Sequence, residues 1–513
     1  MKKILALGSQ EFSEVIGNNC IYIDKTKDIY KLITEGKYYF LSRPRRFGKS
    51  LLANTLKEIF LGNKKLFKGL WIYDKWDWEK AYPVIKISFA SIDHNTLGLE
   101  TAIDIQLDKI AKSYGHVLDM KSIANKFKEL IVKISGQAQV AVIIDEYDKP
   151  IIDYIDELEK AKENLGILRN FYSAVKDADK YIRFFFVTGV SKFSNVSVFS
   201  NLNNLSDITL NRKYSRMIGW TEEEVVDYFP DHIAKVKERY KNIFPDIMQK
   251  IREWYDGYSW DGQTRLYNPV SLMNLFAQQD FRNYWFETGT PTFLLKLIKE
   301  KKFTAFDIEN SYISTNLLDK YEITKITLLA LLFQTGYLTI KNYNRNSGDI
   351  ILDYPNREVA DSFSVHILSE LVYEEIDLTD NLLYKIRRSF IENEIEDFIE
   401  YINTLFSNIP YNLIDRKEKY FHSLFYLVLK IIGYNVETEI LTIKGRIDAV
   451  VRTDGNIYIL EFKIDQSAQK AIDQIKERNY AQKYKDDKRP VSLLGINFDT
   501  DKKMIDDYII ELQ

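Results

Sequence analysis

The stretch Arg43-Pro44-Arg45-Arg46-Phe47-Gly48-Lys49-Ser50 decides which fold we expect for the N-terminal half of this chain. It follows the short apolar run 38–41 and precedes the amphipathic run 52–60. A strand, a loop and a helix in this order, with Gly-Lys-Ser at the turn, form the layout of a phosphate-binding loop. We expect Lys49 to reach the β- and γ-phosphates of a nucleotide and the Ser50 hydroxyl to ligate Mg²⁺, while backbone N–H groups surround the phosphates.

The first position of this loop departs from the usual pattern, because Arg43 stands where a glycine is expected. The start of the loop must therefore accommodate a residue with a side chain. Gly-Lys-Ser alone arises readily by chance, so the prediction needs a second signal elsewhere in the chain. The side chains of Arg45 and Arg46 are suited to bind the nucleotide or, equally well, the backbone of a nucleic acid.

The second signal is the unbroken apolar run 140–144, which is typical of a strand buried on both faces of a parallel sheet. The run ends in Asp145 and Glu146. An acid at the end of such a strand can hold Mg²⁺ together with Ser50, and the following glutamate can polarise the attacking water. The plainer alternative, a solvated acidic pair after a core strand, is the less favoured explanation beside the upstream loop.

A third expected strand, 182–187, ends at Thr188. Its hydroxyl would sense the γ-phosphate, although a hydroxyl that merely caps the strand explains this residue almost as well. The predicted nucleotide-binding set is Arg45, Arg46, Phe47, Gly48, Lys49, Ser50, Leu51, Asp145 and Thr188.

Composition and charge indicate an intracellular protein of several domains. The 513 residues exceed what one hydrophobic core supports, so we expect about two to four domains. A formal net charge of −3 gives no sign of nucleic-acid binding, yet a local basic cleft would suffice for it. The single cysteine, Cys20, excludes an intrachain disulfide framework and fits a reducing compartment. Because we see neither a signal peptide nor a stretch long enough to span a bilayer, we expect a cytoplasmic protein without membrane association.

The alternation of strands and helices from about 20 to 215 predicts a parallel sheet with helices on both faces. The mostly helical segment 221–281 fits a helical lid on that sheet. Residues 282–375 form a helix and then a hairpin pattern, similar to a winged helix. We therefore expect an α/β protein with an ATPase domain at 1–281, a helical, winged-helix-like region at 282–375 and a further α/β domain at 376–513. In the ATPase domain, two further sheet strands are expected at 84–89 and 207–210. In the last domain, the expected elements are a helix at 418–432, strands at 435–440, 445–451 and 456–462, a helix at 466–483 and a final strand at 490–498.

The expected C-terminal strands carry a second group of reactive side chains. Glu461 and Lys463 point to the same face, because side chains alternate along a strand, and Asp448 lies in the middle of the neighbouring strand. The two carboxylates would bind Mg²⁺ for phosphodiester hydrolysis, and Lys463 would position water or steady the charge on phosphate. An aspartate inside an apolar strand is costly to bury, which favours this function over a cross-strand ion pair on a solvated face. Glu418 and Gln474 on the flanking helices are weaker candidates.

The N-terminal region resembles the bacterial family of predicted AAA-type ATPases, and the C-terminal segment is similar to the PD-(D/E)XK nuclease superfamily. The second resemblance assigns Asp448 and Glu461-Phe462-Lys463 as the nuclease core motif and implies that DNA is favoured over RNA. The ATPase family shares the arginine at the first position of the loop, so Arg43 does not imply an inactive enzyme. The motifs that carry the first resemblance are Tyr22-Ile23-Asp24-Lys25-Thr26, Arg43 to Ser50, Ile144 to Asp148, Val187 to Ser191, Asp256-Gly257-Tyr258 and Tyr267-Asn268-Pro269.

We favour an ATP-dependent nuclease or nucleic-acid remodeller that uses ATP and Mg²⁺. The alternative is a regulatory or signalling ATPase whose C-terminal domain only binds nucleic acid or a protein. A binding module without ATP turnover is less favoured, because both Asp145 and Glu146 are present. If the ATPase domain assembles as a homo-oligomer, Arg212 and Arg216 are candidates for an arginine finger, although solvated surface charge explains them better.

Overall fold

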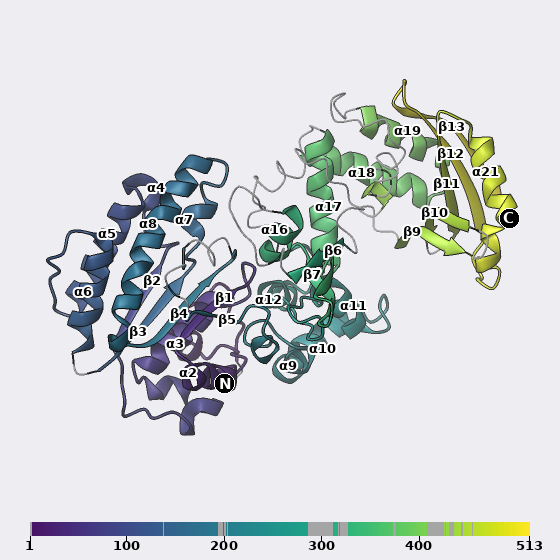
Figure 1. The fold of residues 1–513 in the computed structure, drawn as a ribbon. Helices are drawn as coiled ribbons and strands as arrows, with labels where there is room; N and C mark the ends of the chain where they lie inside the picture. The colour runs from purple at the N-terminus through teal and green to yellow at the C-terminus, as the bar shows by residue number, and fades with distance from the viewer. Residues whose placement is uncertain are drawn as a thin grey trace. The chain divides into compact units, whose positions relative to one another are not determined.

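The chain divides into two compact units, each described by itself (Figure 1). The first comprises residues 1–288 and 310–359, and the second comprises 289–309 and 360–513. The predicted middle region 282–375 is thus shared between the units, and its boundaries stay a prediction. The computed structural model describes residues 3–136, 138–192, 198–199, 202, 204–285, 311–315, 318, 327–372, 376–407, 425, 427–429, 435–442, 445–453 and 455–513.

A five-stranded parallel sheet in the order β2-β3-β4-β1-β5 forms the centre of the first unit. Every residue of β1 and β3 is buried, as their continuous apolar sequences predict. The parallel sheet is therefore confirmed. The last expected strand is shorter than predicted, because β5 pairs with β1 at only two residues. The strands are β1 (Tyr38–Ser42), β2 (Val84–Ser88), β3 (Val140–Asp145), β4 (Ile182–Gly189) and β5 (Ser206–Asp207).

Helices cover this sheet through their apolar stripes. The helix after the phosphate-binding loop, α3, packs against β2 and β3, and three longer helices, α5, α6 and α8, pack against one another (Figure 1). The helices of this part are α1 (Phe12–Gly17), α2 (Thr26–Glu35), α3 (Lys49–Phe60), α4 (His94–Leu97), α5 (Leu99–Ser113), α6 (Ile123–Ser135), α7 (Lys149–Ile152) and α8 (Leu158–Asp177). Short 3-10 turns lie at Lys64–Phe67, Trp71–Asp74, Asp179–Tyr181 and Arg212–Tyr214.

The expected helical segment after the sheet consists of α9 (Glu222–Tyr228), α10 (Pro230–Tyr240), α11 (Ile247–Tyr255) and α12 (Pro269–Gln278). A capping box between Thr221 and Glu224 begins α9. These helices share a core that includes Phe229, Ile251 and Leu272. We call residues 221–278 the lid segment, and its role as a lid stays a prediction.

The predicted hairpin is present, and a third strand extends it. Strands β7 (Thr339–Asn344) and β8 (Asp349–Asp353) are antiparallel, and β6 (Ser311–Ser314) pairs with β8. The apolar helix expected before the hairpin corresponds to α16 (Leu328–Thr335), while residues 319–326 lie outside the described part of the chain. Helix α17 (Arg357–Val372) follows the hairpin.

The second unit contains a five-stranded mixed sheet in the order β13-β12-β11-β10-β9, antiparallel except between β11 and β12. Helix α21 (Ala468–Glu477) packs on β11 and β12. This helix is shorter than the helix expected at 466–483, and a separate 3-10 turn follows it at Tyr480–Tyr484. The remaining elements are α18 (Ile376–Ile391), α19 (Ile395–Ser407), β9 (Asn435–Thr442), β10 (Gly445–Arg452), β11 (Ile457–Ile464), β12 (Val491–Asp499) and β13 (Met504–Leu512).

The expectation that 490–498 is the final strand was wrong, because β13 adds an edge strand after it. Strand β13 reads Met-Ile-Asp-Asp-Tyr-Ile-Ile-Glu-Leu, in which apolar and polar residues do not alternate, so no period-two pattern reveals the strand. The helix expected at 418–432, with Glu418, lies outside the described residues apart from 425 and 427–429. Among the helices that the structure describes, none is both long enough and apolar enough to cross a membrane.

Candidate functional site

The predicted phosphate-binding loop, residues 43–48, connects β1 to the start of α3. Gly48 has a φ of 93°, a left-handed conformation that glycine adopts without steric cost, and α3 begins at Lys49. The Lys49 ammonium is buried and donates to the carbonyl oxygens of Arg43 (2.9 Å) and Pro44 (2.7 Å). Burial lowers the pKa of Lys49, and the nearby charge of Asp145 opposes this shift. The loop thus places a helix N-terminus and a buried cation together, which is the chemistry that binds phosphate.

The two acids predicted to act on the nucleotide lie at the end of β3. Asp145 is buried, and its Oδ1 atom has no hydrogen-bond partner among the described residues. Glu146 has a φ of 51°, a left-handed backbone that costs a residue with a side chain about 1–3 kcal/mol. Burial and the charge of Asp145 raise the pKa of Glu146. Such strain and an unpaired buried oxygen are typical of a functional site.

Thr188 and Asp148 lie at the end of β4 and after β3. The Thr188 hydroxyl is buried and donates to the Leu41 carbonyl oxygen (2.8 Å), so in this structure it links β4 to β1, and its role as a phosphate sensor stays a prediction. Asp148 is the last residue of the motif Ile144 to Asp148, and the sequence alone predicts no role for it. Its Oδ2 accepts from the backbone N–H groups of Val190 (3.0 Å) and Ser191 (2.6 Å), which fixes the chain after β4.

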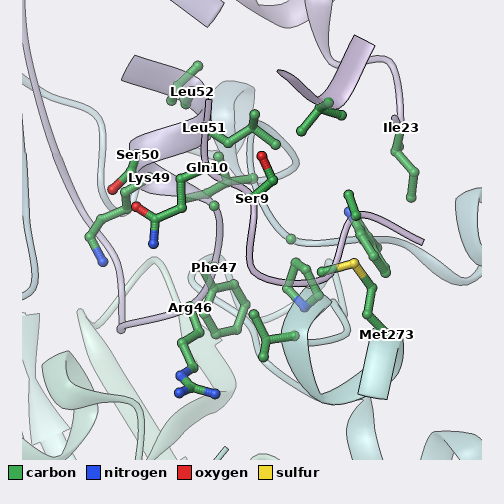
Figure 2. A pocket seen from close by; sticks show the side chains of 18 of the residues that line it. Ser9, Gln10, Ile23, Arg46, Phe47, Lys49, Ser50, Leu51, Leu52 and Met273 are labelled. Carbon is green, nitrogen blue, oxygen red and sulfur yellow. The ribbon is translucent and has the colours of Figure 1, made fainter. Parts of the chain in front are cut away.

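A cavity of about 580 Å³ extends from the phosphate-binding loop. Figure 2 shows Lys49 and Ser50 on one side of it, and Ile23 and Met273 on the other. The walls come from segments 6–10, 21–23, 217–220 and 269–274, together with the loop and Glu146. The predicted residues Arg45, Arg46, Phe47, Gly48, Lys49, Ser50 and Leu51 all line it.

Sequence reasoning missed most of these walls. The signal that could have found part of them is Tyr267-Asn268-Pro269, because Asn268 caps α12 by accepting from the N–H groups of Val270 (3.0 Å) and Ser271 (3.2 Å). The signature at 22–26 has a similar role. Its Lys25 lines the cavity and forms an ion pair with Glu224 of the lid segment (2.6 Å). Both signatures thus shape the cavity wall.

The arginine candidates outside the loop do not line this cavity. Arg212 and Arg216 are exposed, as solvated surface charge would be. Their assignment as an arginine finger, and with it the assembly of the ATPase domain into a homo-oligomer, stays a prediction.

The second group of predicted residues converges in the C-terminal sheet. The register pairs Ala449 of β10 with Leu460 of β11, which brings the preceding Asp448 next to Glu461. Asp448 Oδ2 accepts from the Phe462 N–H (2.9 Å). Glu461 Oε1 accepts from Lys463 Nζ (3.1 Å), on the same strand face as predicted.

Helix α21 contributes to this group as well. Gln474 Nε2 donates to Glu461 Oε1, so this weaker candidate does reach the acids. Glu461 is buried, and its Oε2 has no hydrogen-bond partner in the described part of the chain. Burial, reinforced by the charge of Asp448, raises the pKa of Glu461 to about 7.

Both groups fit a Mg²⁺ ion. Each holds a buried carboxylate with an unpaired oxygen, Asp145 Oδ1 and Glu461 Oε2, and Mg²⁺ binds through one or two carboxylates while keeping several waters. No cluster of three or more His, Cys, Asp or Glu side chains suited to a metal occurs among the described residues.

Comparisons with known proteins agree with this geometry. Residues 6–199 match the family described as Predicted AAA-ATPase, and residues 416–508 match the PD-(D/E)XK nuclease superfamily. The chain is 38% identical over 525 residues to an Azotobacter chroococcum mcd 1 protein described as an uncharacterized protein in the vnfD 5' region, with 99% of each chain covered. No solved structure matches. The chain therefore belongs to the family of predicted AAA-ATPases, and it carries a C-terminal domain of the PD-(D/E)XK nuclease superfamily.

Proposed function

We propose that the protein binds and hydrolyses ATP and that this ATPase controls a Mg²⁺-dependent nuclease, with DNA favoured over RNA as its substrate. The observation that carries the proposal is the unpaired, buried carboxylate oxygen in each site, Asp145 Oδ1 and Glu461 Oε2. A buried carboxylate oxygen without a partner is costly, so its retention at two motif positions supports a role in holding a cation.

In the ATPase site, the phosphates would lie against the N-terminus of α3, and the base would occupy the apolar side of the cavity near Ile23 and Met273. Lys49 would exchange its carbonyl partners for phosphate oxygens. Glu146 would accept a proton from the attacking water, a task for which its raised pKa suits it. Ser50 and Asp145 would hold the Mg²⁺, which supplies charge stabilisation at the phosphoryl group when bound.

In the nuclease site, Asp448 and Glu461 would hold the metal, which polarises the scissile phosphate when bound. Lys463 Nζ, which now donates to Glu461, would orient water or stabilise the developing negative charge. Gln474 keeps the Glu461 carboxylate in place through its Oε1 atom. That contact leaves the Oε2 atom for the metal.

The test incubates the purified full-length protein with ATP, Mg²⁺ and labelled single- and double-stranded DNA and RNA. We expect ATP hydrolysis that Glu146→Gln abolishes and cleavage that Glu461→Gln abolishes. Glu461→Gln should leave ATP hydrolysis near the wild-type rate, because Glu461 belongs to the other unit. Any loss of cleavage in Glu146→Gln measures the control that the ATPase exerts on the nuclease. If the wild-type protein cleaves none of the substrates with any divalent metal or nucleotide, the C-terminal group is a binding site only. The regulatory ATPase would then be the better description.

A further inference from the structure

The residue that replaces the first glycine of the loop is buried inside the first unit. Only 1% of Arg43 is exposed, and its Nη1 donates to the carbonyl oxygens of Ser42 (2.9 Å) and Thr209 (2.8 Å). The Nε and Nη2 atoms have no hydrogen-bond partner among the described residues. Burial lowers the pKa of Arg43 to about 9, and the charges of Asp207 and Asp261 oppose this shift. A guanidinium in such a place needs a further stabilising contact.

The guanidinium contacts the indole ring of Trp260 in the lid segment directly. The Arg43 guanidinium carbon lies 4.2 Å from the ring centroid, within the range of a cation–π interaction. The same indole meets Phe47 edge-on, with centroids 5.2 Å apart, and Tyr258 meets Phe47 from a second direction at 4.7 Å. Arg43 stands at the start of the loop, and Phe47 stands next to Gly48 at its end. One tryptophan therefore contacts both ends.

The segment that carries Trp260 is itself held firmly. The Ser259 N–H donates to the Thr339 hydroxyl of β7 (2.6 Å), and that hydroxyl donates to the Ser259 carbonyl oxygen (3.1 Å). Asp261 Oδ1 accepts from the N–H groups of Gln263 (2.9 Å) and Thr264 (2.7 Å), which closes the turn after Trp260. The indole is thus a fixed surface against which the loop rests.

We propose that Arg43 is a positioning residue of the ATPase and that Trp260 is the surface on which it positions the phosphate-binding loop. The backbone carbonyl of Arg43 is one of the two that now hold Lys49, so a shift of Arg43 displaces the lysine that must reach phosphate. Neither Arg43 nor Trp260 lines the cavity, and their effect on the nucleotide is indirect. The inference rests on the proposed ATPase function.

The test measures the dissociation constant for ADP by calorimetry, and KM and kcat for ATP, in full-length variants. Trp260→Leu and Arg43→Met should each raise the ADP dissociation constant about tenfold, the scale of a desolvated cation–π contact. The double variant should bind no more weakly than either single variant, because both lose the same contact. Trp260→Phe keeps an aromatic face and should restore binding to within about threefold of wild type. KM should change more than kcat, since Glu146 is untouched.

Trp254→Leu is a matched control, because Trp254 stacks on Arg357 with a centroid distance of 5.1 Å in the same unit. It should lower the melting temperature without changing ADP binding. Should Trp260→Leu fail to fold, Arg43→Lys replaces it, since it keeps the charge but loses the planar guanidinium and should also weaken binding. Wild-type affinity in the folded Trp260 or Arg43 variants overturns the positioning role alone. Absence of nucleotide binding by the wild-type protein overturns the proposed ATPase together with this inference.

Discussion

Glu461 should make the nuclease site sensitive to pH when Mg²⁺ is limiting. In the proposed site, the metal would bind the ionised Glu461 carboxylate in competition with a proton, and burial raises the pKa of this carboxyl to about 7. About one-tenth of the Glu461 side chains are ionised at pH 6 and about nine-tenths at pH 8, so cleavage at limiting Mg²⁺ should rise about tenfold over this range. A glutamate with an ordinary pKa near 4.3 would be ionised throughout and would give a flat profile.

The assay follows cleavage of a labelled duplex from pH 6 to pH 8 at limiting and at saturating Mg²⁺, with Mn²⁺ binding measured by calorimetry in parallel. Saturating metal should displace the proton and flatten the profile. Lys463→Met should move the midpoint of Mn²⁺ binding to higher pH, because the lysine lowers the pKa of Glu461. Subtraction of the Glu461→Gln titration removes the contribution of metal at the ATPase site. A flat metal-binding profile at limiting metal would refute the reasoning.

Four further outcomes are expected. Lys49→Ala should abolish ATP binding in a filter assay, whereas Glu146→Gln should keep binding and stop phosphate release, since only the first residue neutralises phosphate charge. Asp448→Ala should remove cleavage at saturating Mg²⁺ and leave ATP hydrolysis near the wild-type rate, and equal loss of both activities would contradict two independent sites. Nucleic-acid affinity measured between 50 and 200 mM salt should fall, with about −0.9 added to the log–log slope for each phosphate contact on duplex DNA, and a flat response would indicate a protein partner. Burial raises the pKa of Glu358 to about 8, so Glu358 binds its proton more tightly in the folded chain than in the unfolded chain. Its contribution to stability is therefore present at acidic pH and is lost as pH rises toward 8. Glu358→Gln should weaken the fall in melting temperature between pH 6 and pH 8.

The sequence predicted the elements whose residues experience one uniform environment. Strands β1 and β3 are buried on every residue, so their apolar runs were clear signals. Strand β13 is a half-exposed edge, in which Asp506 and Asp507 stand next to each other, and no period reveals it. The short pairing of β5 was also unpredictable, because two residues carry no periodic pattern.

The same contrast holds for the candidate sites. Lys49, Asp145 and Glu461 stand out as candidates because their residue types are required at fixed positions after strands or turns, and their roles stay predictions. The far wall of the cavity was not predictable, because apolar residues such as Met273 and Ile23 look like core residues until the tertiary fold leaves space beside them. For Thr188 the sequence left two roles open, a phosphate sensor and a strand cap, and in this structure its hydroxyl donates to the Leu41 carbonyl oxygen.

Arg43 shows why a sequence motif identifies the residues that carry the chemistry more readily than the residues that hold them in place. In a loop that begins with glycine, the backbone itself provides the close turn, and the motif alone describes it. Here a buried arginine takes that position, and the compensating indole, Trp260, lies 217 positions later in the chain. Because that separation is bridged only by the folded lid segment, no local pattern can link the two residues. The loop and the lid segment therefore have to be considered as one structural element, and substitutions in either should be judged by their effect on Lys49.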